Sequence, residues 1–264
     1  ATYAGLRRAQ VLWGRCYEGG GAPPYWPWVQ GIRQYAQEKE PDQLRKDMGS
    51  TASVIAEVVP EIKERLPGLQ PPPPLESPES ARFRLFDSIS AFLKGASRTQ
   101  PIVLVLEDLH WSDQPSLQLL EFVAKELSNA RVLLIGTYRD MELSRQHPLS
   151  QTLGDLNRER LFTKVLLRGL SQEDVAKFIE MASGVKPPPG LVDAVQTRTE
   201  GNPLFVTEVV RLLVQEGHLT REGHPEQSEG SRSRKTSTWT VRIPEGVREV
   251  IGRRLNRLTA RCNE

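Results

Sequence analysis

Two adjacent carboxylates, Glu107 and Asp108, follow an apolar run at residues 102–106. The run has no polar alternation and is too short to cross a membrane, which predicts a strand buried on both faces of a parallel sheet. In open α/β sheets, ligands bind at the carboxyl ends of the strands, where this acidic pair would stand. Carboxylate oxygens suit Mg²⁺, and a neighbouring carboxylate can orient water. The pair predicts a magnesium nucleotide site; the alternative is a buried strand that happens to end in an acidic turn.

A second polar group follows the next predicted buried strand, at residues 132–137. The helix expected to end at Leu127 joins the two strands, and this strand, helix, strand order predicts a right-handed parallel unit. Thr137 and Arg139 would then emerge at the same edge of the sheet as the acidic pair. There they could contact a terminal phosphate; the alternative is that Arg139 pairs with Asp140 in a surface turn.

The glycines at 19–21 resemble part of a phosphate loop, but the residues after them argue against that interpretation. A phosphate loop needs glycine N–H groups facing the phosphates, followed by Lys and then Ser or Thr. Here Pro23 and Pro24 remove backbone donors, and no Gly-Lys-Ser or Gly-Lys-Thr occurs in the sequence. We expect a loop that packs its aromatic residues against a core, namely Tyr25, Trp26 and Trp28.

The elements that would position these groups alternate between strand and helix. A first strand is expected at 11–14, and helical spacing from 28 to 66 predicts two or three helices. Four prolines at 71–74 predict a stiff connector, after which Ser77 would cap a helix that ends at Gly95. The segment between the first strand and the acidic one is too long for a simple crossover, so it is expected to be a helical insertion.

The second half of the chain changes character. A helix is expected at 149–159 and a further strand at 162–167, and a cap formed by Ser171 with Asp174 then predicts a helix. The pattern beyond is helical, with segments at 191–198 and 205–215.

Residues 220–240 have no apolar periodicity, which predicts a long irregular loop. A short strand at 239–243 and a helix at 244–258 would follow it. The basic cluster at 232–235 is more simply a solvated loop than a nucleic-acid contact.

Composition excludes several classes of protein. The 264 residues are 38% hydrophobic and 26% charged, as in soluble globular proteins, and we expect a cytoplasmic protein without membrane spans or a secretory signal. The net charge of +2 gives no reason to expect nucleic-acid binding through this portion. The two cysteines, Cys16 and Cys262, have neither metal-binding nor disulfide-like spacing.

Several blocks of the sequence together resemble the STAND class of AAA-like P-loop ATPases, especially the Orc-like AAA modules of large bacterial regulators and adenylate cyclase fusions. The resemblance covers essentially the whole chain. The blocks are VLWGRCYEGGGAPPYWPW at 11–28, ESPESARFRLFD at 76–87, VLVLEDLHWSD at 103–113, LLIGTYRD at 133–140, GNPLFVTEVVRLL at 201–213 and IPEGVREVIGRRL at 243–255.

The resemblance implies ATP or ADP and Mg²⁺ as ligands and assigns roles to six residues. Glu107 and Asp108 would form the Walker B element, which holds the metal and serves hydrolysis. Thr137 and Arg139 would form the sensor-1 region. The remaining two, Gly201 and Pro203, would form the GxP motif that lies against the adenine.

The resemblance also implies an α/β fold with a parallel-sheet P-loop NTPase core, followed by a helical domain and the start of a winged helix. We expect the core at 1–170, with a helical insertion at 26–96, a helical lid at 171–219, and a loop with the start of the winged helix at 220–264. The core would be incomplete, because the family has a Walker A phosphate loop before the first strand and no such motif occurs in this sequence. An N-terminally truncated module with weak affinity for nucleotide is therefore expected.

The function expected from the resemblance is an ATP-binding or ATP-hydrolysing regulatory switch in a multidomain signalling or transcriptional regulator. Its partners would be effector and sensor domains of the same polypeptide, with a homo-oligomer as a further expectation. The alternatives are a degenerate protein-interaction scaffold that does not hydrolyse ATP and an Orc-like ATPase associated with DNA.

Overall fold

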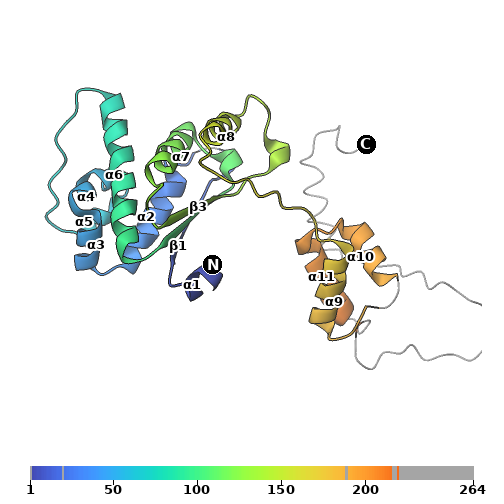
Figure 1. Cartoon of the computed structure of the whole chain (residues 1–264). Helices are drawn as coiled ribbons and strands as arrows, with labels where there is room; N and C mark the ends of the chain where they lie inside the picture. The colour runs from blue at the N-terminus through green and yellow to red at the C-terminus, as the bar shows by residue number, and fades with distance from the viewer. Residues whose placement is uncertain (1, 20, 188–189, 216–218, 220–264) are drawn as a thin grey trace, which may run out of the picture. The chain divides into compact units, whose positions relative to one another are not determined.

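The computed structural model describes residues 2–19, 21–187, 190–215 and 219. The chain divides into two compact units, Ala1–Thr163 and Lys164–Glu264, which we describe separately (Figure 1). The strand expected at 239–243, the helix at 244–258, the basic cluster at 232–235 and the winged helix all lie outside the described residues.

The first unit is built on a parallel sheet in the order β1-β2-β3. The strands are β1 (Gln10–Arg15), β2 (Ile102–Glu107) and β3 (Val132–Gly136). Both pairings are parallel, so the carboxyl ends of the three strands lie at one edge of the sheet. The predicted α/β class and parallel sheet are confirmed.

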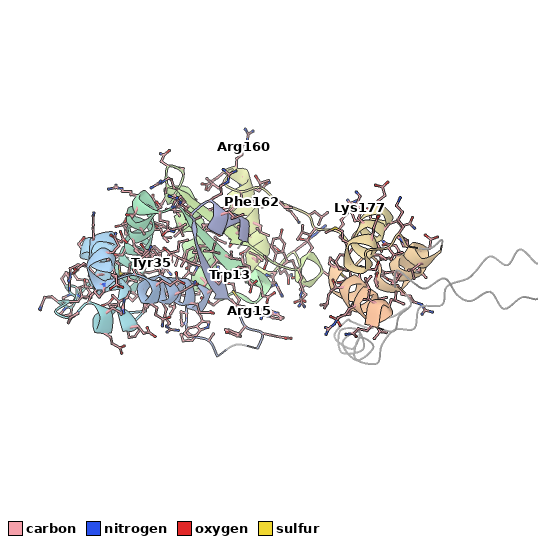
Figure 2. The ribbon with its side chains drawn as sticks, turned by 90° about the horizontal axis from the view of Figure 1, so that it is seen from below. Trp13, Arg15, Tyr35, Arg160, Phe162 and Lys177 are labelled. Atoms are coloured by element: carbon pink, nitrogen blue, oxygen red, sulfur yellow. The ribbon has the colours of Figure 1, made fainter. Side chains whose placement is uncertain are left out.

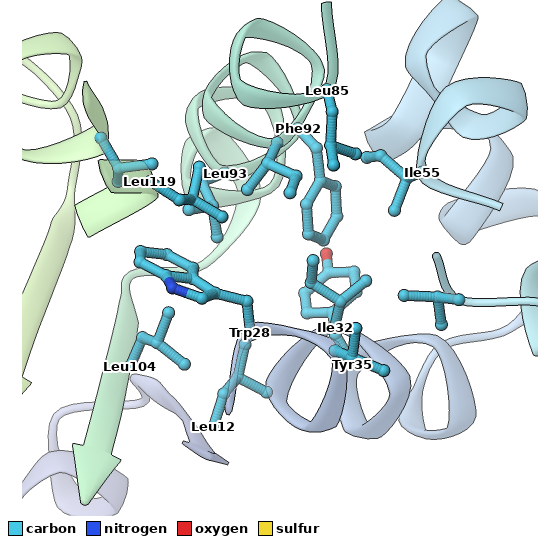
Figure 3. Close-up of a cluster of buried hydrophobic side chains, with 14 of the residues drawn as sticks. Leu12, Trp28, Ile32, Tyr35, Ile55, Leu85, Phe92, Leu93, Leu104 and Leu119 are labelled. Carbon is cyan, nitrogen blue, oxygen red and sulfur yellow. The ribbon is translucent and has the colours of Figure 1, made fainter. Parts of the chain in front are cut away.

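Helices cover one face of this sheet. Leu12 of β1 and Leu104 of β2 point toward Trp28 on helix α2 (Trp26–Glu38), as Figure 3 shows. Leu93 of α6 (Pro78–Thr99) and Leu119 of α7 (Gln114–Glu126) complete this part of the core. The Trp28 indole is anchored as well as buried, because its Nε1–H donates to the Ser116 carbonyl at 3.2 Å.

The opposite face of the sheet leaves apolar side chains of the outer strands β1 and β3 exposed within the described residues, whereas Val105 of the central strand is buried. Trp13, Val105 and Ile135 occupy equivalent positions in the three strands and therefore share this face. Trp13 is 41% exposed, and Leu133 and Ile135 of β3 are 56% and 40% exposed. The prediction that residues 132–137 form a buried strand is wrong in this respect, since an apolar run does not show how many faces its neighbours cover.

Helices occupy the segment between β1 and β2, and side-chain contacts link them. After α2 come α3 (Pro41–Met48), η1 (Gly49–Thr51), α4 (Ala52–Ile55) and α5 (Glu61–Arg65). The Tyr35 hydroxyl donates to Asp47 at 2.6 Å, and its ring packs edge-on against Phe92 of α6. A short helix, α1 (Thr2–Leu6), precedes β1.

Local capping chemistry sets the starts of the long helices. Ser77 accepts a hydrogen bond from the Ser80 N–H at 3.1 Å and caps α6 as predicted, although α6 continues past Gly95 to Thr99. Asp113 caps α7 by accepting from the Ser116 N–H at 2.9 Å.

The region after β3 departs from the expectation. Helix α8 (Pro148–Arg158) forms as predicted, capped by His147. The strand predicted at 162–167 is absent, and Val165, Leu166 and Leu167 are exposed. The prediction is wrong because a strand needs a hydrogen-bonding neighbour, and residues 162–167 pair with no strand in the described part of the chain.

The secondary structure in the described residues of the second unit is helical. It contains α9 (Gln172–Ser183), α10 (Leu191–Thr199) and α11 (Pro203–Gln215). The Ser171 hydroxyl caps α9 by accepting from the Asp174 N–H at 3.2 Å. The core of this unit consists of aliphatic side chains, chiefly Val175, Ile179, Leu191, Val195, Val206, Val209 and Val210.

In neither described unit does a helix have the length and apolar character that crossing a membrane requires.

Candidate functional site

The acidic pair lies where the central strand ends. Glu107 is the last residue of β2, and Asp108 turns the chain into the short helix η2 (Leu109–Trp111). Asp108 adopts left-handed backbone angles, with φ 58° and ψ 43°, a conformation that Asp tolerates better than most residues. The sharp turn keeps both carboxylates at the carboxyl edge of the sheet.

Thr137 joins the end of β3 to the acidic pair. Its hydroxyl oxygen accepts a hydrogen bond from the Asp108 N–H at 3.2 Å. Its backbone N–H donates to the Leu106 carbonyl at 3.0 Å, and its own carbonyl accepts from the Leu109 N–H at 2.8 Å. Thr137 therefore holds the turn at Asp108 through both backbone and side chain.

Arg15, the last residue of β1, contacts the acidic pair from the other side. Its Nε lies 3.0 Å from Asp108 Oδ2, and it stands opposite Glu107 in the β1–β2 register. Figure 2 shows Arg15 and Trp13 close together along β1. The Arg15 side chain is 57% exposed and that of Asp108 is 19% exposed, so the carboxylate is the better shielded partner. Arg15 was not among the site residues predicted from the sequence.

Arg139 follows β3 but faces the loop after β2. Its Nη1 lies 2.6 Å from Glu142 Oε1, and its guanidinium carbon lies 5.5 Å from the centre of the Trp111 ring. Glu142 ends the short helix η3 (Asp140–Glu142). The expected alternative for Arg139 was an ion pair with Asp140 in a surface turn. The carboxylate found with it is Glu142, which was not predicted from the sequence.

His110 is a buried residue beside this group. Its side chain is fully shielded, and its Nε2 lies 3.2 Å from Glu142 Oε2. Burial lowers the pKa of the imidazole below its ordinary value, while the nearby Glu142 and Asp108 carboxylates oppose that shift. His147 anchors the backbone here through a 2.9 Å contact between its Nε2 and the His110 carbonyl. In the sequence, the position of His110 two residues after the acidic pair was the available signal.

Comparison with known proteins decides the family. A family model described as "AAA ATPase domain" matches residues 1–135, which include β1, β2, the acidic pair and most of β3. The chain belongs to the AAA ATPase domain family. A second model, a domain of unknown function (DUF8739), matches residues 161–222.

The AAA chain is also similar to an uncharacterised protein, R02095, of Rhizobium meliloti (strain 1021). The two are 30% identical over 145 residues, which are 53% of this chain and 13% of that relative. The chain thus matches a small part of that relative's length. No solved structure matches it.

The AAA family implies nucleotide binding that generally depends on Mg²⁺, and the carboxyl edge offers a suitable set of donors. Mg²⁺ is usually held by one or two carboxylates together with phosphates and water. Glu107 and Asp108 fit that pattern. Within the described residues there is no group of three or more His, Cys, Asp or Glu that could hold a metal.

Gly201 and Pro203 belong to the second unit of the AAA chain, where Gly201 has a clear packing role. Its φ is +71°, and a Cβ there would lie 2.3 Å from the Leu170 carbonyl oxygen. The Leu170 N–H donates to the Gly201 carbonyl at 2.7 Å, so the two backbones touch directly. Pro203 starts α11. Their contact with adenine stays a prediction.

Cys16, just after β1, is a buried free thiol. Burial raises its pKa to about 11, which keeps it protonated and unreactive at neutral pH. Cys262 lies outside the described residues.

Proposed function

We propose that this chain is the nucleotide-binding part of a regulatory switch in a multidomain signalling or transcriptional regulator of the STAND class. Binding and release of ATP would change the state of the module, and effector and sensor domains of the same polypeptide would respond. Membership of the AAA ATPase domain family supports the nucleotide part of this proposal.

The observation that carries the proposal is the link between Asp108 and Thr137. The two residues come from neighbouring parallel strands and meet through the 3.2 Å hydrogen bond at the carboxyl edge of the sheet. The bond joins the Thr137 hydroxyl to the backbone N–H of Asp108, so it fixes the turn that carries the acidic pair and keeps a hydroxyl at the same edge of the sheet. Carboxylates at this edge suit Mg²⁺, and a hydroxyl there suits the phosphate oxygens.

Each predicted residue receives a distinct role in the proposal. Glu107 and Asp108 would hold Mg²⁺ and orient water, and the metal would supply positive charge against the phosphates. Thr137 fixes the turn at Asp108 and offers its hydroxyl to the terminal phosphate, to which Arg139 contributes a positive charge. For the GxP motif we retain the proposed contact of Gly201 and Pro203 with adenine.

The test compares nucleotide binding with nucleotide hydrolysis in the longest natural protein that contains this chain. Glu107→Gln and Asp108→Asn should leave most ATP affinity intact, measured by calorimetry. Each should lower hydrolysis at least about tenfold, a loss of ~1.4 kcal/mol of transition-state stabilisation. Glu126→Gln is the matched control, because Glu126 pairs with Lys94 at the other end of α7. If Glu107→Gln and Asp108→Asn both hydrolyse ATP at the rate of the parent, the roles assigned to these two residues are excluded.

One alternative function has a specific observation behind it. The 264 residues contain no Gly-Lys-Ser or Gly-Lys-Thr, and Arg15 already neutralises Asp108. Both features also suit a scaffold that binds protein and does not hydrolyse ATP. Absence of ATP binding in the natural protein, with folding intact, would favour the scaffold.

A further inference from the structure

Glu142 uses both oxygens of its carboxylate to connect two loops. Oε1 lies 2.6 Å from Arg139 Nη1, and Oε2 lies 3.2 Å from His110 Nε2. Arg139 follows β3, whereas His110 follows β2, so the carboxylate bridges the segments that leave the two strands at the functional edge.

The Arg139 guanidinium is restrained on two sides. Glu142 pairs with it, and the Trp111 ring lies under it at 5.5 Å. The backbone supports this arrangement, because the Glu142 N–H donates to the Arg139 carbonyl at 3.1 Å. The Arg139 side chain therefore has a defined position in this structure, and the Glu142 carboxylate balances its charge.

A paired guanidinium meets a phosphate only by giving up its carboxylate or by sharing its N–H groups between two anions. Arg–carboxylate and Arg–phosphate pairs use the same planar donors, so the two anions compete directly. The Arg139 side chain is 44% exposed and that of Glu142 is 36% exposed, which makes the pair weak enough to exchange.

His110 gives the carboxylate a second partner. Glu142 Oε2 lies 3.2 Å from Nε2 of the buried imidazole, although the two atoms do not form a hydrogen bond in this structure. Glu142 keeps this polar neighbour when Arg139 leaves, so the carboxylate is not left with water alone beside it.

We propose that Glu142 is an internal competitor for Arg139 that stands in for the terminal phosphate and so determines how strongly the site prefers ATP over ADP. The inference rests on the proposed function, in which Arg139 meets the terminal phosphate. Glu142 is a specificity-determining residue that acts through Arg139 and does not touch the nucleotide.

The first experiment measures ATP and ADP affinity by calorimetry in the natural protein and its Glu142→Gln variant. The variant should bind ATP about fivefold more tightly, with ADP affinity within about twofold of the parent, because ADP lacks the phosphate in competition. Glu126→Gln, which removes the same charge from a surface pair, should change neither affinity. In an Arg139→Ala background, Glu142→Gln should have no effect on ATP. Equal ATP affinity in parent and variant overturns the inference.

A second measurement separates this inference from the proposed function. The NMR signals of the Arg139 guanidinium are followed while tripolyphosphate is added to parent and to Glu142→Gln. We expect the signals of the variant to shift at about fivefold lower tripolyphosphate concentration. If ATP does not bind but this difference holds, the nucleotide function fails and the competition by Glu142 stands. If the signals move at the same concentration in both proteins, or in neither, the inference about Glu142 is overturned whether or not ATP binds.

Discussion

Arg15 Nε and Asp108 Oδ2 lie 3.0 Å apart, so the last residue of β1 neutralises the carboxylate that follows β2. A guanidinium on this oxygen competes with any cation that approaches the acidic pair. Exposed ion pairs of this kind contribute about 0 to 1 kcal/mol, so the contact restrains the carboxylate without blocking it permanently.

The first prediction concerns this contact. Arg15→Gln should increase the apparent affinity for Mg²⁺ in the presence of ATP by about twofold to fivefold, because Asp108 loses its competing cation. The measurement is displacement of Mn²⁺, followed by electron paramagnetic resonance. Arg45→Gln removes the same charge from an exposed pair with Asp42 and should leave metal affinity unchanged. Equal affinity in all three proteins would show that Arg15 and the metal do not compete.

The hydroxyl of Thr137 gives a second prediction. Thr137→Ala removes the hydrogen bond to the Asp108 N–H and should destabilise the turn by about 0.5 to 1.5 kcal/mol. Hydrogen exchange at the Asp108 amide should then become faster. Thr137→Ser keeps the hydroxyl and should exchange like the parent; fast exchange in the serine variant would mean that the methyl group, and not the hydrogen bond, holds the turn.

A third prediction tests the close contact between β1 and the start of α2. A Cβ on Gly14 would lie 1.8 Å from the Pro27 carbonyl oxygen, a backbone atom that cannot rotate away. Gly14→Ala should therefore lower the free energy of unfolding by more than about 2 kcal/mol, measured by urea denaturation. Gly154→Ala in α8 is the control, since a Cβ there meets nothing within 4 Å. That control should be neutral or stabilise the protein by about 0.5 to 1 kcal/mol. Equal stability of the two variants would contradict the packing at Gly14.

Features of the fold that depend on neighbours in the chain were predictable from the sequence. The caps at Ser77 and Ser171 follow from residues three positions apart, and the strand at 102–107 follows from one uninterrupted apolar run. The approach of Thr137 to Asp108 also follows, because parallel strands end at the same edge of a sheet.

Features that depend on distant partners were not predictable. The contacts of Glu142 with Arg139 and His110 arise from the path of two loops, which no periodicity records. Residues 162–167 have the composition of a strand, but composition does not supply the neighbouring strand that pairing requires. The exposure of one side of β3 was not predictable for the same reason. Leu133 and Leu134 are chemically alike, and their different surroundings in the fold leave Leu133 the more exposed.

The last prediction concerns the open face of the sheet. Trp13, Leu133 and Ile135 expose apolar surface on one face, and β3 has one edge without a strand partner in the described part of the chain. Apolar surface next to free backbone N–H and C=O groups favours pairing with another copy. We therefore expect the 264-residue chain, expressed as such, to self-associate in a concentration-dependent way, measured by size-exclusion chromatography with light scattering.

Substitutions on that face test whether the exposed sheet face itself drives association, rather than exposed apolar side chains in general. The double change Leu133→Lys and Ile135→Lys adds charge to the exposed face and should shift the chain toward monomer, because burying either lysine against another copy is costly. Met181→Lys is the control, since Met181 is an exposed apolar side chain on α9 of the second unit, and it should leave association unchanged. Thermal unfolding of all three proteins shows whether the lysines perturb the fold. A monodisperse parent chain, or an equal effect of the control, would mean that the open face of the sheet does not drive association.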